Sequence, residues 1–398
     1  MARLSNRGRS MPASPIRRLV PFADGARARG LHVHHLNIGQ PDIPTPRAMI
    51  EAYQSFDAKV LAYGPSQGLP ELRRAIADYW TGEGYPIRSS AVTVTFGGSE
   101  AAVFAMAAVA DPTDEVLTAD PFYANYLGFA AQAGVTLSSY PAHADDGFRL
   151  PPDEELEQYI GPKTRAILIV NPGNPTGAVY GPEEMARLGR LAEKHDLFII
   201  SDEVYRELVY DGAEVVSAFG LDCADERVIV VDSVSKRFSA CGARVGAVIT
   251  KSAELADAFM RMAFARLCPA TVDQLAAIAA YTVPSTYFEE VVAEYRRRRD
   301  VLVDGLLSIP GVETYRPEGA FYAVATLPVE DCDHFAEWLL SSFSLDAETV
   351  MMAPASGFYS DPSRGRRQAR LAYVLNTDAL RRSIEILRAG LEAYPGKP

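Results

Sequence analysis

A lysine flanked by hydroxyl groups lies in one of four chemically unusual segments of this sequence. Lys236 belongs to the run Asp232-Ser-Val-Ser-Lys-Arg-Phe238, which directly follows the β-branched run 228–231, and Arg244 comes eight residues later. Such a lysine could be an ordinary surface residue. Hydroxyl groups and a guanidinium would, however, also hold a phosphate beside the amine.

Turn-forming residues follow two other predicted strands. Gly97-Gly-Ser-Glu100 comes after the run 91–96 and before an apolar helical pattern. Glycines let the backbone approach a ligand, and helix N-terminal amides favour an anion such as phosphate, although such glycine turns are commonly structural. Asn171-Pro-Gly-Asn-Pro-Thr-Gly177 follows the strand pattern 166–170. Its two Asn-Pro steps restrict the backbone, so an asparagine held there can direct its amide toward a ligand.

An acidic residue ends a further predicted strand. Asp202, in Ser201-Asp-Glu-Val-Tyr205, follows the run 198–200, where a solvated aspartate would also be ordinary. In open parallel sheets, ligands bind beyond the carboxyl ends of the strands. We therefore expect the segments that follow these strands to meet at one site.

Alternating strands and helices must position the four segments. Runs rich in β-branched residues are apolar on both faces and alternate with helical patterns such as 99–110 and 182–195. This predicts an α/β fold with a mostly parallel central sheet and helices on both faces. Near Tyr287 the pattern changes to a long charged helix from Glu289, then strands near 320–326 and 370–374, which predicts a smaller α+β domain. We expect an N-terminal arm and part of the small domain in 1–45, the large domain in 46–286, and the remaining small domain in 287–398.

Composition excludes several classes of protein. The 398 residues are 48% hydrophobic and 23% charged, as in globular chains of two or three domains. A net charge of −12 repels nucleic acid and anionic lipid, and no apolar run reaches the roughly 18 residues of a membrane span, so we expect neither partner. Four cysteines without a CxxC pair indicate no metal site and fit a reducing cytoplasm. The arginine-rich first 23 residues superficially resemble a transit peptide, but they lack an apolar core and fit a packed arm better.

Together the four segments resemble the aspartate-aminotransferase-like superfamily, the class I/II aminotransferases of fold type I that use pyridoxal 5'-phosphate. Asn174-Pro-Thr-Gly, Asp202-Glu-Val-Tyr205 and Ser233-x-Ser-Lys236 through Gly242-x-Arg244 occur in the family order. The resemblance extends from Asn37-Ile-Gly39-Gln-Pro-Asp to Arg370-Leu-Ala-Tyr, nearly the whole chain. It is strongest toward the bacterial aspartate aminotransferase subgroup.

This resemblance implies the catalytic residues Lys236, Asp202 and Tyr205. Lys236 would carry the cofactor on its amine and, once substrate displaces it, would move a proton between the substrate α-carbon and the cofactor. Asp202 would keep the pyridine nitrogen protonated, which makes the ring an electron sink. Asn174 and Tyr205 would hydrogen-bond the phenolic oxygen of the cofactor.

The resemblance also implies the residues that hold the cofactor and the substrate. Tyr123 would stack on the cofactor ring. Arg370 would bind the substrate α-carboxylate as a planar fork, with Gly39 and Asn174 beside it. Tyr63 matches a tyrosine that reaches the phosphate of the neighbouring subunit, which implies a homodimer with shared active sites. The implied phosphate ligands are Gly98, Ser99, Glu100, Ser233, Ser235 and Arg244.

One departure from the family concerns the substrate. Relatives specific for aspartate or glutamate carry a cation for the distal carboxylate, often a lysine after the paired glycines, and Ser99 stands there in this sequence. Either another cation compensates or specificity is broad. Arg266 is the first candidate, although it could equally form a surface ion pair, and Arg17 and Arg18 are the others. The expected reaction moves an amino group from aspartate to 2-oxoglutarate by a ping-pong route through pyridoxamine phosphate, with aromatic or neutral amino acids as the alternative.

Related folds also carry other functions. A β-lyase or cyclising lyase would hold the cofactor in the same way. Transcription regulators with this fold carry an additional basic DNA-binding domain, for which we expect the roughly 36 residues before Asn37 to be too few. A nicotinamide enzyme would need a GxGxxG motif after a strand, and none occurs at such a position.

Overall fold

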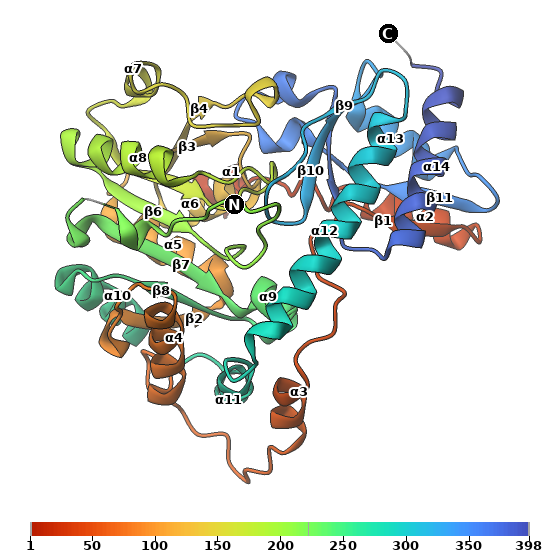
Figure 1. The fold of residues 1–398 in the computed structure, drawn as a ribbon. Helices are drawn as coiled ribbons and strands as arrows, with labels where there is room; N and C mark the ends of the chain where they lie inside the picture. The colour runs from red at the N-terminus through yellow and green to blue at the C-terminus, as the bar shows by residue number, and fades with distance from the viewer. Residues whose placement is uncertain (1, 222, 397–398) are drawn as a thin grey trace.

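A seven-stranded sheet forms the centre of the computed structural model, which describes residues 2–221 and 223–396 (Figure 1). The strand order is β2-β8-β7-β6-β5-β3-β4. Strands β3, β4, β5, β6 and β7 run parallel to one another, whereas β8 is antiparallel to both β2 and β7. The expected α/β fold is therefore confirmed. The strands are β2 (Val92–Phe96), β3 (Glu115–Asp120), β4 (Thr136–Pro141), β5 (Thr164–Val170), β6 (Phe198–Asp202), β7 (Val228–Ser233) and β8 (Val245–Ile249).

Helices cover both faces of this sheet because alternate strand residues enter two separate apolar cores. Ile200 and Val231 belong to the core with α5, α6 and α10, whereas Ile199 and Val230 belong to the core with α4, α8 and α11. One layer consists of α5 (Gly97–Val109), α6 (Asn125–Ala133) and α10 (Ala253–Arg266). The other consists of α3 (Arg47–Gln54), α4 (Pro70–Gly82), α8 (Pro182–Lys194) and α11 (Thr271–Ala280).

Smaller sheets form the second part of the fold (Figure 1). One has the order β12-β13-β10-β9, and β1 pairs in parallel with β11. The strands are β1 (His32–His35), β9 (Glu313–Thr314), β10 (Tyr322–Thr326), β11 (Glu348–Met351), β12 (Ala353–Pro354) and β13 (Gln368–Ala372). The helices are α2 (Val20–Ala28), α12 (Ser285–Leu307), α13 (Cys332–Ser341) and α14 (Thr377–Ala393), and the short helices elsewhere are α1 (Asn6–Ser10), α7 (Asp153–Leu156) and α9 (Val234–Arg237).

The N-terminal segment joins this second part. Leu19, Ala23 and Leu36 share an apolar core with residues of β10, α13 and α14. The long helix α12 begins four residues earlier than the charged pattern indicated, and runs from α11 toward the smaller sheet (Figure 1). The domain limits 1–45, 46–286 and 287–398 stay a prediction. No helix of the described residues is long and apolar enough to span a membrane.

The start of α5 differs from the sequence prediction. The helix begins at Gly97, so the paired glycines form its first turn instead of a preceding loop. Gly97 has φ +71°, and the Glu100 carboxylate accepts a hydrogen bond of 2.9 Å from the Phe96 amide. Gly246 of β8 lies so close that an added Cβ would be 2.4 Å from the Gly97 carbonyl carbon. The N-terminus of α5 therefore packs directly against the first residues of β8.

This close approach predicts that Gly246→Ala destabilises the protein. A methyl group there must displace backbone, and overpacking costs about 1–3 kcal/mol. Urea denaturation should show that loss in the free energy of unfolding. Gly242→Ala is the matched control, since an added Cβ at Gly242 meets nothing within 4 Å. Equal stability of the two variants would contradict the prediction.

Candidate active site

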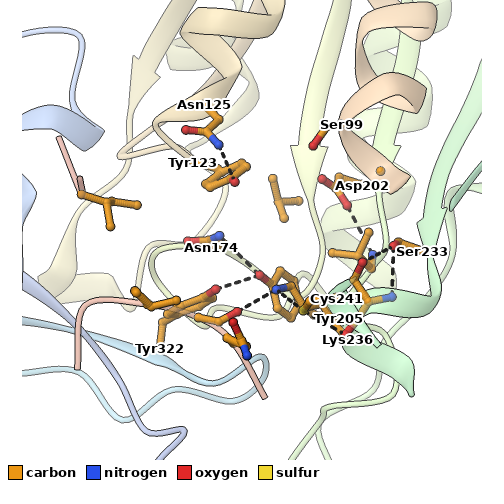
Figure 2. Close-up of a pocket in the computed structure, with 18 of the residues that line it drawn as sticks. Ser99, Tyr123, Asn125, Asn174, Asp202, Tyr205, Ser233, Lys236, Cys241 and Tyr322 are labelled. Atoms are coloured by element: carbon orange, nitrogen blue, oxygen red, sulfur yellow. Dashed lines mark hydrogen bonds between the residues drawn. The ribbon is translucent and has the colours of Figure 1, made fainter. Parts of the chain in front are cut away.

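A cavity of about 500 Å³ lies where the carboxyl ends of β5, β6 and β7 meet the N-terminal segment and the smaller sheet. Figure 2 shows side chains from these elements converging on it. The predicted site residues that line it are Gly39, Gly98, Ser99, Tyr123, Asn174, Asp202, Tyr205, Ser233, Ser235, Lys236, Arg244 and Arg370. The structure thus brings together segments that are up to 331 residues apart in the chain, from Gly39 to Arg370.

Strand order explains why these side chains meet. β5, β6 and β7 are adjacent, and their register pairs Val170 with Asp202 and Asp202 with Val231. Asp202 is the last residue of β6, Asn174 follows β5, and Lys236 lies in α9 directly after β7. Parallel strands end at the same sheet edge, so the residues that follow them share one site.

The Asp202 carboxylate is held inside the protein. Tyr126 donates a hydrogen bond of 2.6 Å to Oδ2, and the Val204 amide donates one of 3.3 Å to Oδ1. Burial raises the pKa of Asp202 to about 6, and both hydrogen bonds counteract this rise. Tyr126, on the first turn of α6, was missed by sequence reasoning. Its only signal was its place three residues after Tyr123, one helical turn away.

The Lys236 amine lies beside two groups that sequence reasoning did not pair with it. Nζ donates a hydrogen bond of 2.7 Å to the Gly39 carbonyl and contacts Cys241 Sγ at 3.4 Å. Cys241 itself lines the cavity. An added Cβ at Gly39 would lie 1.7 Å from the Tyr322 hydroxyl oxygen, so any larger residue there would have to displace this tyrosine.

Two tyrosines and an asparagine form a polar chain along one wall (Figure 2). Asn174 Nδ2 donates to the Tyr205 hydroxyl at 3.4 Å, and the hydroxyls of Tyr205 and Tyr322 are 2.9 Å apart. Burial raises the pKa of Tyr205 well above its usual value, so its hydroxyl keeps its proton. Tyr322, the first residue of β10, was also missed, because nothing in its local sequence distinguishes it from a core tyrosine.

Arg370 is a buried cation without an acidic partner among the described residues. Its Nη2 donates to the Asn37 carbonyl at 2.6 Å and its Nη1 to Asn174 Oδ1 at 3.2 Å. The guanidinium carbon lies 4.4 Å from the centre of the Tyr322 ring. Its Nε is buried and has no hydrogen-bond partner among the residues that the structure describes. An arginine oriented only by neutral groups retains its full attraction for an anion.

A second group of donors surrounds the first turn of α5. Gly98 and Ser99 line the cavity there, and Ser233 Oγ donates to Ser235 Oγ at 2.9 Å. Arg244 adopts φ +54°, and an added Cβ on Gly97 would lie 2.5 Å from its Nη2. Hydroxyls, a guanidinium and helix N-terminal amides in one place form a site for an anion.

Four candidate residues, namely Arg266, Glu100, Tyr63 and Arg18, are not among the residues that line the cavity. Arg266 forms an ion pair of 3.3 Å with Glu100 and donates to the carbonyls of Val94 and Leu267, with only 13% of its side chain exposed. The Glu100 carboxylate is thus engaged away from the cavity, although its amide belongs to the first turn of α5. Tyr63 is 84% exposed in the single chain. Arg17 lines the cavity, whereas Arg18 forms an ion pair with Asp333.

Comparisons with known proteins show which family this chain belongs to. The model of a protein family described as "Aminotransferase class I and II" matches residues 32–384 of this chain. The aspartate aminotransferase of Bacillus subtilis (strain 168) is 31% identical and covers 98% of this chain and 100% of its own length. Aromatic-amino-acid aminotransferase 2 of Thermococcus litoralis is 31% identical over 96% of both chains. The structure of Thermus thermophilus aspartate aminotransferase with maleate has a TM-score of 0.88 at 31% identity, covering 98% and 100%.

Fold, site and relatives therefore define a transferase of fold type I. The chain belongs to the class I and II aminotransferase family, and it is an aminotransferase. Enzymes of this family act on amino acids and 2-oxo acids and are typically dimers.

The contact between Tyr126 and Asp202 predicts that Tyr126→Phe raises the pKa of Asp202 above about 6. The hydrogen bond from Tyr126 stabilises the ionised carboxylate, and such bonds contribute roughly 1.5–3 kcal/mol. Its loss should therefore raise the titration midpoint of Asp202 by about one pH unit or more. Carbon NMR of aspartate-labelled, cofactor-free protein would follow the titration, with Asp202→Asn assigning the signal. Tyr123→Phe is the matched control, since the Tyr123 hydroxyl accepts from Asn125 instead. Equal midpoints in both variants would contradict the role of Tyr126.

Proposed function

We propose that the chain uses pyridoxal phosphate to transfer an amino group from aspartate to 2-oxoglutarate in two half-reactions. The observation that carries this proposal is the cavity itself. A lysine amine, a buried carboxylate and a cation without an acidic partner open onto the same space. Each is a separate requirement of the reaction, respectively a proton carrier, a partner for a protonated ring nitrogen, and a carboxylate receptor.

The residues of the cavity fit pyridoxal phosphate. The phosphate would take the donors at the first turn of α5 together with Ser233, Ser235 and Arg244. Asp202 would face the ring nitrogen, and Asn174 and Tyr205 the phenolic oxygen. When bound, the cofactor supplies a ring that withdraws electrons from the substrate α-carbon. The buried setting of Asp202 favours this role, because a carboxylate in a poorly solvated place gains more from a cationic partner.

Lys236 and Arg370 would act on different groups of the substrate. The Arg370 guanidinium would orient the α-carboxylate, and its hydrogen bond to Asn174 links that end of the substrate to the cofactor side. Lys236 would remove the α-proton and return it at the neighbouring cofactor carbon, which requires one base within reach of both atoms. The Gly39 carbonyl, which now accepts from Nζ, offers the free amine a resting position.

Two features bear on the choice of substrate. Aspartate is the amino acid in the name of the Bacillus subtilis relative, and maleate, a dicarboxylate, was present in the Thermus thermophilus structure. Ile16, Val20, Ile38 and Phe129 also line the cavity, and this apolar lining favours aromatic or neutral amino acids as the second candidate. Incubating the loaded protein with a panel of amino acids and following the change in cofactor absorbance would identify the donor.

We also propose a homodimer with shared sites, in the reducing cytoplasm that the four unpaired cysteines favour. Val60, Leu61 and Tyr63 are between 71% and 84% exposed, and Phe264 and Leu267 are 62% and 50% exposed. The Gly64 amide donates to Cys268 Sγ, so these two apolar segments lie side by side. A second copy of the chain would cover them and bring Tyr63 to the neighbouring cavity.

The assignment of Lys236 predicts where the cofactor attaches. Borohydride reduction of the loaded protein followed by peptide mass mapping should place the adduct on Lys236. Lys236→Ala should retain some cofactor through the phosphate contacts but lose transamination by several orders of magnitude. Lys251→Ala is the control, because Lys251 pairs with Asp225 away from the cavity. An adduct on another residue, or none, would overturn the assignment.

The shared site predicts complementation between two defective subunits. Mixing Lys236→Ala with Tyr63→Phe gives hybrid dimers in which one site carries both changes and the other neither. Activity after subunit exchange should therefore exceed that of either unmixed variant. A mixture no more active than its parents would show that each site is built from one chain.

A further inference from the structure

Positively charged side chains outnumber negatively charged ones in the lining of the cavity. Four cations line it, namely Arg17, Lys236, Arg244 and Arg370, whereas Asp202 is the only acid among the described lining residues. The proposed function uses Lys236 for the proton, Arg244 for the phosphate and Arg370 for the α-carboxylate. It leaves Arg17 without a task.

Packing fixes the backbone that carries Arg17. Its amide donates to the Ser14 carbonyl at 3.2 Å and to Ser14 Oγ at 3.3 Å, so residues 14–17 form a turn ahead of α2. Ile16 packs against the apolar cluster that contains Phe358, and Leu19, 2% exposed, belongs to the apolar core around the smaller sheets. The turn is therefore anchored on both sides of Arg17.

The two adjacent arginines of this turn have different surroundings. Arg18 reaches away from the cavity to its ion-pair partner Asp333, at the start of α13. The guanidinium of Arg17 has no hydrogen-bond or ion-pair partner among the residues that the structure describes. Arg266, the other cation considered for this role, is already paired with Glu100. Arg17 is thus the cavity cation that remains available for a ligand.

We propose that Arg17 binds the side-chain carboxylate of a dicarboxylic substrate, an inference that rests on the proposed function. A dicarboxylate carries one carboxylate for Arg370 and a second that the cavity must also receive. Ser99 lines the cavity as a neutral side chain and brings no charge to that second group. A guanidinium offers it two parallel donors, and a carboxylate that loses water without meeting a cation is disfavoured.

The test compares Arg17→Leu with Arg18→Leu and Arg266→Leu in the loaded enzyme. Each removes one arginine, but only Arg17 lines the cavity. The measurements are kcat/KM for aspartate, glutamate, alanine and phenylalanine, and the dissociation constants of maleate and propionate from protein fluorescence. Arg17→Leu should lower kcat/KM for the two acidic amino acids and weaken maleate, each by about tenfold or more, since a charged hydrogen bond is lost. Alanine, phenylalanine and propionate should change much less, and Arg18→Leu should change none of these values selectively.

Arg17→Lys provides the rescue. It keeps the charge but loses the planar fork, so it should recover part of the selectivity for aspartate over alanine. Equal losses for all four amino acids in Arg17→Leu, or a selective loss in Arg266→Leu instead, would overturn the role of Arg17. A wild type that prefers phenylalanine or alanine would overturn it as well. A wild type that transaminates none of the amino acids would overturn the proposed function itself.

Discussion

The ends of three adjacent parallel strands are the constraint on which the site depends. Because β5, β6 and β7 end at one sheet edge, Asn174, Asp202 and Lys236 meet although they are separate in the chain. Burying a carboxylate at that edge is unfavourable by itself, and the raised pKa of Asp202 records this cost. Tyr126 reduces it through a hydrogen bond, and a bound cation would reduce it further. The apolar cores on both faces of the sheet hold this unfavourable arrangement in place.

The other half of the site comes from residues near both ends of the chain. Arg370 lies on β13, and its guanidinium donates to the carbonyl of Asn37, which follows β1. Tyr322 lies so close to Gly39 that a side chain at that position would have to displace it. The N-terminal segment and the smaller sheet thus act as one wall. We expect substrate selectivity to reside there, because the opposite wall holds the residues proposed to bind the cofactor.

Charge distinguishes the cavity from the rest of the molecule. The whole chain carries a net charge of −12, yet four cations and one acid line the cavity among the residues that the structure describes. A cationic cleft in an acidic protein concentrates small anions. Amino acids, 2-oxo acids and a phosphorylated cofactor all carry the anionic groups that such a cleft selects.

The sequence by itself determined the α/β fold and identified twelve of the residues that line the cavity. It could do so because β-branched runs that alternate with helical patterns locate the strands, and because the residues after parallel strands share one edge of the sheet. The resemblance to the family indicated the other residues. Local spacing could not show that Tyr126 reaches Asp202, or that Tyr322 reaches Tyr205, since those pairs join different elements. Nor could it separate Arg17 from Arg18 or foresee that Glu100 engages Arg266. Adjacent side chains point to different surroundings according to how their turn packs, and only the tertiary structure decides that.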